Sequence, residues 1–261
     1  MLRLVDQPRP FTWWVMRPFS ERYRVQYDAR ELPDWQRIVL RRTVFIPELK
    51  LLYVINAKAA SSSLRDMMFT LGGGSPGAGP GRGLYFPTRR WREVVAAWTD
   101  PAVYRFTVSR DPASRAVSAF TNLFVNRNNG FEFRHIPYLR RTGLKFGDAS
   151  PANFERFLDY VEEVQAESEL FCDAHLRLQT HNVGARHLKF TRLGRYESLA
   201  ADVATIMAEA GVSSFTPGAL GWDNKALRPS GLQLTPAQRD RIGRIYAEDY
   251  NRFGYPQPGA I

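Results

Sequence analysis

The sequence predicts an α/β fold in which a central parallel sheet lies between two layers of helices. Two observations support this prediction. The continuous apolar run at residues 51–56 (LLYVIN) is typical of a strand buried on both faces of a sheet, and residues 103–109 (VYRFTVS) predict a second strand. A helical pattern follows each run at once, and strands that alternate with helices form parallel sheets.

The elements are predicted in chain order. Residues 1–47 are rich in Pro, Arg and aromatic residues, which indicates an irregular N-terminal arm or lid with one strand at 41–46. A catalytic core at 48–255 follows, within a single domain that covers 1–261. After the strand at 51–56, an apolar stripe with helical spacing predicts a helix; its members are Leu64, Met67, Met68 and Leu71.

Caps mark the later helices. Asp111 and Pro112 begin a helix after the strand at 103–109, and Ser150 with Pro151 repeats the same cap and proline. A third strand is predicted at 187–193. A helix that Gly211 closes comes next. One last helix, opened by a capping box at Thr235, runs to Phe253.

Composition limits the class of protein. The 261 residues carry 36 Lys+Arg against 26 Asp+Glu, a net charge of +10, and only five of the basic residues are Lys. An Arg-rich surface suits polyanionic partners, although a compositional bias of the source would produce the same excess. Cys172 is the only cysteine, which excludes an internal disulfide and a Cys-based zinc site. No run of about 18 apolar residues occurs, so we expect no membrane span.

The first candidate site is the junction at residues 56–64 (NAKAASSSL), where a buried strand meets a helix. Backbone N–H groups at a helix N-terminus bind anions, and Lys58 adds a full charge. Ala59 and Ala60 allow an anion to approach the backbone closely, and the following serines add hydroxyl donors. The alternative is an ordinary Ser-capped helix, since the P-loop spacing G-x-x-x-x-G-K-[ST] is absent.

The second candidate site is at residues 109–120 (SRDPASRAVSAF), again between a strand and a helix. Arg110 precedes the helix, and Asp111, Arg115 and Ser118 share one helical face. Parallel sheets bind ligands at the carboxyl ends of their strands, so two such sites predict a ligand with two separated anionic groups. The alternative is a capped helix with one intrahelical ion pair.

These motifs resemble those of the carbohydrate sulfotransferases of the chondroitin and dermatan type. KAASSSL resembles their 5′-phosphosulfate loop, with Ala57 in place of Pro and Ser62 in place of Thr, and VSRDPASRAVSAF resembles their 3′-phosphate motif. The resemblance continues at 173–179 (DAHLRLQ), 194–202 (GRYESLAAD) and 245–255 (IYAEDYNRFGY). The N-terminus lacks the family's membrane anchor and has no signal-peptide core, which indicates a soluble, bacterial-type, cytoplasmic member.

The resemblance implies a P-loop-like fold, related to nucleotide kinases, and a cofactor. The cofactor is 3′-phosphoadenosine 5′-phosphosulfate (PAPS), used without a metal. Residues 58–63 would hold the 5′-phosphosulfate; they are Lys58, Ala59, Ala60, Ser61, Ser62 and Ser63. Arg110 and Ser118 would hold the 3′-phosphate. Tyr196 is a candidate contact for the cofactor, and Glu197 beside it serves either the adenine or the structure, with its carboxylate as a further candidate base. Lys225 and Arg228 either close a loop over the 3′-phosphate or form a solvated basic loop.

The proton acceptor is sought among four histidines. His175 is the first choice because it belongs to a segment that resembles the family, and His181 is the second. His135, in an Arg-rich loop, is a candidate contact for the substrate, and His187, in a predicted strand, is expected to be structural. The acceptor is expected to be a hydroxyl of a glycan or glycolipid. Nucleic acid is not an expected partner, and contact with a membrane surface stays open. Two alternative functions remain, a nucleotide-dependent phosphotransferase and a polyanion-binding module without catalysis.

Overall fold

The computed structural model describes residues 8–74, 90–126, 135–213, 215 and 231–258. The chain divides into two compact units, which we describe separately. The sheet unit consists of 8–109 and 179–222, and the helical unit consists of 1–7, 110–178 and 223–261. Whether they act as one domain stays a prediction.

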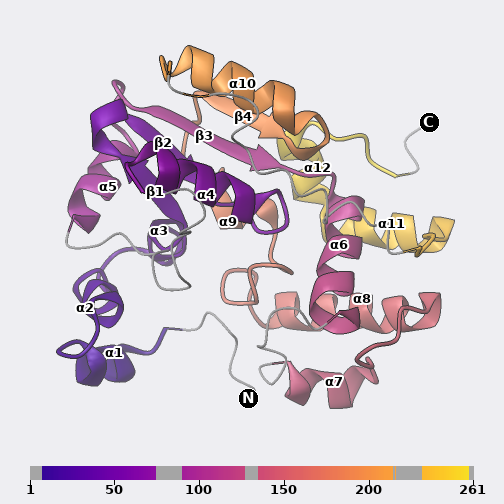
Figure 1. Cartoon of the computed structure of the whole chain (residues 1–261). Helices are drawn as coiled ribbons and strands as arrows, with labels where there is room; N and C mark the ends of the chain where they lie inside the picture. Colours follow the sequence, from indigo (N-terminus) through magenta and orange to yellow (C-terminus); the bar gives the residue numbers. More distant parts are fainter. Residues whose placement is uncertain (1–7, 75–89, 127–134, 214, 216–230, 259–261) are drawn as a thin grey trace. The chain divides into compact units, whose positions relative to one another are not determined.

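The sheet unit contains a four-stranded, mostly parallel sheet in the order β1-β2-β3-β4 (Figure 1). Strand β1 (Thr43–Ile46) is antiparallel to β2 (Leu51–Val54), whereas β3 (Tyr104–Ser109) is parallel to both β2 and β4 (Arg192–Arg195). Helices flank this sheet, so the predicted α/β fold class is confirmed.

Both faces of the sheet are buried. On one face, Tyr53 and Phe106 pack in a cluster with side chains of α4 (Ser61–Leu71) and α10 (Leu199–Glu209). Leu52 and Val54 alternate with Tyr53 and point to the opposite face, where they too are fully buried. The continuous apolar run at 51–56 is therefore explained by a strand that is buried on both faces of the sheet, as predicted.

The prediction of a strand at 187–193 was wrong. Residues up to Lys189 belong to turns that follow α9 (Gln179–Val183), and β4 begins only at Arg192. Gly184, at a φ of +65°, starts these turns, and its carbonyl accepts hydrogen bonds from the N–H groups of His187 and Leu188. Leu188 is buried in this turn, so its apolar character has a cause other than a strand.

The prediction of an irregular N-terminal arm was also wrong. Three helices precede β1; they are α1 (Pro10–Met16), α2 (Glu21–Asp28) and α3 (Asp34–Leu40). The strand predicted within this arm at 41–46 is confirmed as β1. Farther along the chain, α5 (Trp91–Ala97) follows α4. Prolines stand at the first position of α1 and just before α3, where proline favours a helix start. Prolines that suggested irregular structure therefore mark helix boundaries.

The helical unit contains five helices within its described residues. They are α6 (Pro112–Phe120), which continues as a π-helical turn at Thr121–Val125, α7 (Ile136–Thr142), α8 (Pro151–Glu167), α11 (Pro236–Ile245) and α12 (Ala247–Phe253). The predicted caps at Asp111, Ser150 and Thr235 are confirmed. The single last helix is corrected to two, because the chain leaves the helical conformation at Tyr246, whose buried hydroxyl donates to the Leu176 carbonyl over 3.0 Å.

Candidate functional site

The start of α4 has an unusual backbone. Lys58 and Ala60 adopt left-handed conformations with φ of 70° and 56°, which non-glycine residues rarely do. Ala60 precedes the helix and has no polar side chain, so no side-chain cap occupies the first turn. The first N–H groups of a helix lack intrahelical acceptors. This turn therefore presents backbone donors, surrounded by the hydroxyls of residues 61–63 and the half-buried Lys58.

Asn56 fixes the position of this loop. Its fully buried side chain donates to the Val108 carbonyl over 3.0 Å and to Oε1 of Gln179 over 2.8 Å. It thereby connects the carboxyl ends of β2 and β3 with α9. The sequence analysis assigned Asn56 to the strand and missed this role, although a polar residue at the end of an apolar run was a visible signal.

The start of α6 is arranged differently. The Asp111 carboxylate accepts a hydrogen bond from the Ser114 N–H over 2.7 Å, so the helix is capped by its own sequence. Arg110 is only 9% exposed, and its Nε donates to the Ser114 hydroxyl over 2.9 Å. Ser118 is half-buried on the same helix. A guanidinium and a hydroxyl, in place of open backbone donors, define this candidate site.

Arg115 does not lie on a surface face. It is 1% exposed and donates from Nη2 to the Ala174 carbonyl over 3.0 Å. Burial lowers the pKa of its guanidinium, while Tyr246 and Asp249 act in the opposite direction. Its role in the structure is to hold the chain near residue 174.

His175 forms a dyad with Asp173. Nδ1 of His175 lies 2.7 Å from Oδ1 of Asp173, and the backbone N–H of His175 donates to the same oxygen over 2.8 Å. A carboxylate can only accept, so Nδ1 carries the proton and Nε2 is left as the proton acceptor. The His175 side chain is 31% exposed, which leaves it accessible to a substrate.

A second histidine lies behind this dyad. Buried His135 has its Nε2 3.9 Å from Oδ2 of Asp173 and its Nδ1 2.6 Å from the Tyr160 hydroxyl. Burial alone raises the pKa of the Asp173 carboxyl, but the charge and hydrogen bonds of His175 and the charge of His135 outweigh it and hold that pKa well below its usual range. Asp173 is therefore a stable anion that orients His175.

Four side chains hold the backbone of the segment that carries the dyad. Besides Arg115, Arg177 donates to the Cys172 carbonyl over 2.7 Å, and Gln165 and Tyr246 donate to the Leu176 carbonyl over 2.9 and 3.0 Å. The family resemblance identified the segment but none of these supports, three of which come from outside it.

The remaining predicted residues have varied surroundings. His181 is buried in α9 and belongs to the sheet unit. His187 stacks on Trp35 with ring centroids 4.3 Å apart, which agrees with a structural role. Tyr196 is half-buried and begins a 3₁₀ turn after β4. Lys225 and Arg228 lie outside the described residues.

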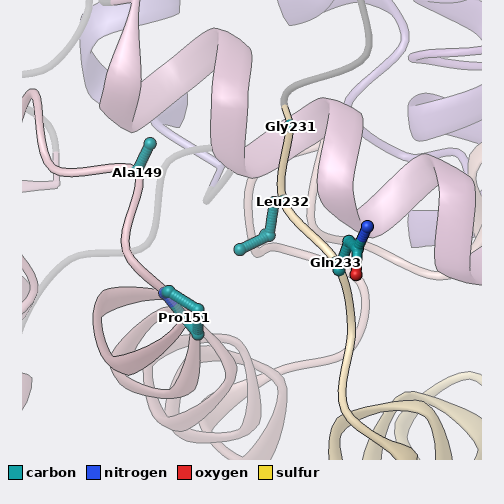
Figure 2. A pocket seen from close by; sticks show the side chains of 5 residues that line it. All are labelled: Ala149, Pro151, Gly231, Leu232 and Gln233. Atoms are coloured by element: carbon teal, nitrogen blue, oxygen red, sulfur yellow. The ribbon is translucent and has the colours of Figure 1, made fainter.

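The helical unit also has a shallow hollow (Figure 2). Ala149, Pro151, Gly231, Leu232 and Gln233 line it, and none of the predicted site residues is among them. Among the described residues, no group of three or more His, Cys, Asp or Glu side chains is arranged to hold a metal ion. In the same part of the chain, no helix is long and apolar enough to cross a membrane.

Comparisons with known proteins match the region of the chain that contains these motifs. The sequence profile described as the Sulfotransferase family matches residues 41–256. The chain is 24% identical to carbohydrate sulfotransferase 12 of Xenopus laevis over 59% of its own length and 40% of that protein. It is 24% identical to carbohydrate sulfotransferase 10 of Danio rerio over 87% of its length and 69% of that protein. It is 28% identical to carbohydrate sulfotransferase 10 of Rattus norvegicus over 59% and 48% of the two chains.

The chain matches only part of the length of these relatives. The chain spans less than half the length of the frog and rat proteins. No solved structure is significantly similar to it. The family profile, however, covers both candidate anion sites, the His175 segment and most of the sheet. The chain belongs to the sulfotransferase family.

Proposed function

We propose that the enzyme transfers a sulfuryl group from PAPS to a hydroxyl of a carbohydrate or glycolipid. The family generally uses this donor, and the similar proteins are named carbohydrate sulfotransferases. The observation that carries the proposal is the uncapped start of α4, with Lys58 beside it, at the end of a parallel strand. A phosphotransferase and a non-catalytic polyanion binder are not favoured by the family assignment.

The start of α4 fits the 5′-phosphosulfate. Ala59 is fully buried and small, so it leaves room at the backbone, and the three serines that follow place hydroxyls around the first turn. Lys58 brings the positive charge that two anionic groups require. The residues assigned to this group are Lys58, Ala59, Ala60, Ser61, Ser62 and Ser63.

The start of α6 fits the 3′-phosphate. A guanidinium binds a phosphate through two parallel hydrogen bonds, and Arg110 is already oriented by its bond to Ser114. Ser118 would add a hydroxyl donor. Tyr196 as a contact for the cofactor, and Lys225 and Arg228 over the 3′-phosphate, remain part of the proposal on the resemblance alone.

Different residues would act on the leaving phosphate and on the acceptor hydroxyl. When bound, PAPS supplies a sulfuryl group whose bond to the phosphate breaks as a new bond to the acceptor oxygen forms. Lys58 would balance the negative charge that grows on the leaving phosphate oxygen. Nε2 of His175 would accept the proton of the acceptor hydroxyl, and Asp173 would stabilise the resulting imidazolium.

Two measurements test the overall function. Transfer of labelled sulfate from PAPS to a panel of glycans, glycolipids and small phenols should identify the acceptor class, and transfer to phenols alone would contradict a carbohydrate acceptor. Calorimetry with a chelator present should show that the product 3′-phosphoadenosine 5′-phosphate (PAP) binds more tightly than AMP. Equal affinity for the two would contradict a 3′-phosphate site.

The proton acceptor is tested with two variants. His175→Ala should lower kcat by about 10²- to 10⁴-fold and leave PAP affinity unchanged, because the base contacts only the acceptor. Activity should fall at acid pH, since an imidazolium cannot accept a proton. His181→Ala should instead lower stability, because it removes a buried side chain. If His175→Ala is active and a folded His181→Ala is inactive, His181 replaces His175 as the proton acceptor. If both variants are active, neither histidine is the proton acceptor, and the Glu197 carboxylate is tested next.

A further inference from the structure

An exposed apolar surface surrounds the first helix. Among the described residues, seven large apolar side chains are exposed, and five of them lie within nine consecutive positions. The α1 patch consists of these five, Phe11, Trp14, Val15, Met16 and Phe19. Phe11 and Phe19 are 75% and 81% exposed, which is far more than incidental surface exposure requires. Contiguous patches of this kind mark interaction sites on soluble proteins.

The patch results from the orientation of α1. Phe11, Trp14 and Val15 are spaced i, i+3 and i+4, so they share one face of the helix, and that face is exposed. Trp13 points elsewhere and is buried. The helix packs beside α2 in the sheet unit (Figure 1). Its inner side is therefore already in contact with the protein, and the apolar outer face is left for another partner.

The charges near the patch are mostly positive. Residues 8–30, which include α1 and its neighbour α2, contain five arginines and two acidic residues, Glu21 and Asp28. Arg9 at the start of α1 is exposed, as is Arg24 on α2. Aromatic and aliphatic side chains flanked by arginine are typical of helices that lie in the interface of a bilayer. Anionic lipid headgroups would complement the arginines.

Two other occupants fit this surface less well. A glycan requires carboxylates, amides or other polar groups that bond its hydroxyls, and the five side chains of the patch offer at most the indole N–H of Trp14. A second copy of the chain, bound symmetrically through the same patch, would bring arginines of both copies together. An anionic lipid surface satisfies both the apolar face and the charge.

We propose that the α1 patch docks the enzyme on an anionic membrane surface, with Phe11, Trp14 and Val15 entering the headgroup region. The exposed Arg9 and Arg24 would lie at the level of the lipid phosphates, whereas Arg17 stacks on the Tyr27 ring. The proposal does not depend on the reaction, because binding to vesicles can be measured without donor or acceptor. It does give a reason for a glycolipid acceptor, which such docking would bring near the enzyme.

The test is co-sedimentation of the full chain with vesicles of phosphatidylcholine, with and without phosphatidylserine. We expect binding to the anionic vesicles that weakens at high salt. The double variant Phe11→Ala with Trp14→Ala should weaken binding at least about tenfold, because two aromatic side chains no longer enter the interface. Arg9→Gln with Arg24→Gln should weaken it by about fivefold per arginine on anionic vesicles only.

Leu193→Ala is the matched control, since Leu193 is an exposed apolar side chain of the same unit outside the patch. It should bind vesicles like the parent chain. Unchanged binding by the double aromatic variant, with unchanged circular dichroism, would overturn the proposal. A parent chain that is dimeric in solution and becomes monomeric in that variant would overturn it too, in favour of a second copy. Loss of glycan binding without loss of vesicle binding would assign the patch to the acceptor.

Discussion

Helices α4 and α6 both begin directly after a strand, but their first turns differ in backbone conformation and in capping. Each follows a strand of the parallel sheet, and each contains small residues, serines and a basic side chain just before the helix, Lys58 or Arg110. The α4 start is uncapped and has two residues in left-handed conformations. The α6 start is capped by Asp111, begins with proline and has no such strain among its described residues.

This difference shows how two helix starts can serve two anionic groups. At α4 the backbone itself can bind, because no side chain occupies the first turn and the helix dipole is positive there. At α6 the Asp111 carboxylate already occupies that position, which is why the proposal assigns an anion there to the Arg110 guanidinium and the Ser118 hydroxyl. Under the proposed function, the reacting group would lie at the start of α4 and the anchoring 3′-phosphate at the start of α6.

The largest effect is expected at α4. Lys58→Ala should lower kcat by about 10²-fold or more, because the charge partner of the leaving oxygen is lost. Its free energy of unfolding should change little, since Lys58 is only half-buried. Steady-state sulfate transfer and chemical denaturation measure the two quantities.

Lys50→Ala is the control for this variant. Lys50 also has a left-handed backbone, at a φ of 46°, but it stands at the other end of β2 and is exposed. Its replacement should leave turnover at the parental value. Equal losses in the two variants would attribute the effect to backbone strain and would remove Lys58 from the site.

A smaller effect is expected at α6. Arg110→Ala should reduce the preference for PAP over AMP by about 1–3 kcal/mol, because the 3′-phosphate loses its forked partner in a buried position. Arg110→Lys should recover part of the preference, since it keeps the charge and loses the fork. Calorimetry with both nucleotides measures the difference. A preference that survives in both variants would place the 3′-phosphate elsewhere.

Local sequence signals predicted much of this fold. The strands at residues 51 and 103 and the caps at Asp111, Ser150 and Thr235 depend on neighbouring residues, and all five are confirmed. The strand expected at 187–193 begins only at Arg192, because the N–H groups of His187 and Leu188 close a turn by donating to the Gly184 carbonyl. The break between α11 and α12 was also missed, since it coincides with a hydrogen bond from Tyr246 to a segment 70 residues away.

The candidate site shows the same contrast between features that depend on neighbouring residues and features that depend on distant ones. The loops at Lys58 and Arg110 were found because they are continuous motifs. His175 was chosen from such a motif, but its orientation depends on Asp173 and on Arg115, for which the sequence predicted only a helical face shared with Asp111 and Ser118. Periodicity shows which residues share a face and does not show that a charged residue on that face is buried.

A moderate loss of stability is expected when the cap of α6 is removed. Asp111→Ala should lower the free energy of unfolding by about 0.5–2 kcal/mol, because the Ser114 N–H loses its acceptor. PAP affinity should hold or rise, since a carboxylate near the phosphate is lost. Ser150→Ala removes the equivalent cap of α8 and should cost about as much stability with no change in PAP affinity. Loss of PAP binding in Asp111→Ala alone would show that this carboxylate belongs to the site.

The smallest effect concerns the strain at α4. Ala60→Gly should raise the free energy of unfolding by up to about 1 kcal/mol, because glycine adopts a φ of 56° without the clash that a Cβ brings, and this gain exceeds the entropy that glycine adds to the unfolded chain. Ala59→Gly should have the opposite sign. Ala59 is fully buried and not in the left-handed region, so its replacement removes a packed methyl group and gains nothing from the backbone. Denaturant titration of the two variants compares adjacent positions with the same chemical change. A loss of stability in both would mean that the left-handed turn at Ala60 is not strained, and that the difference between the two helix starts lies in their caps alone.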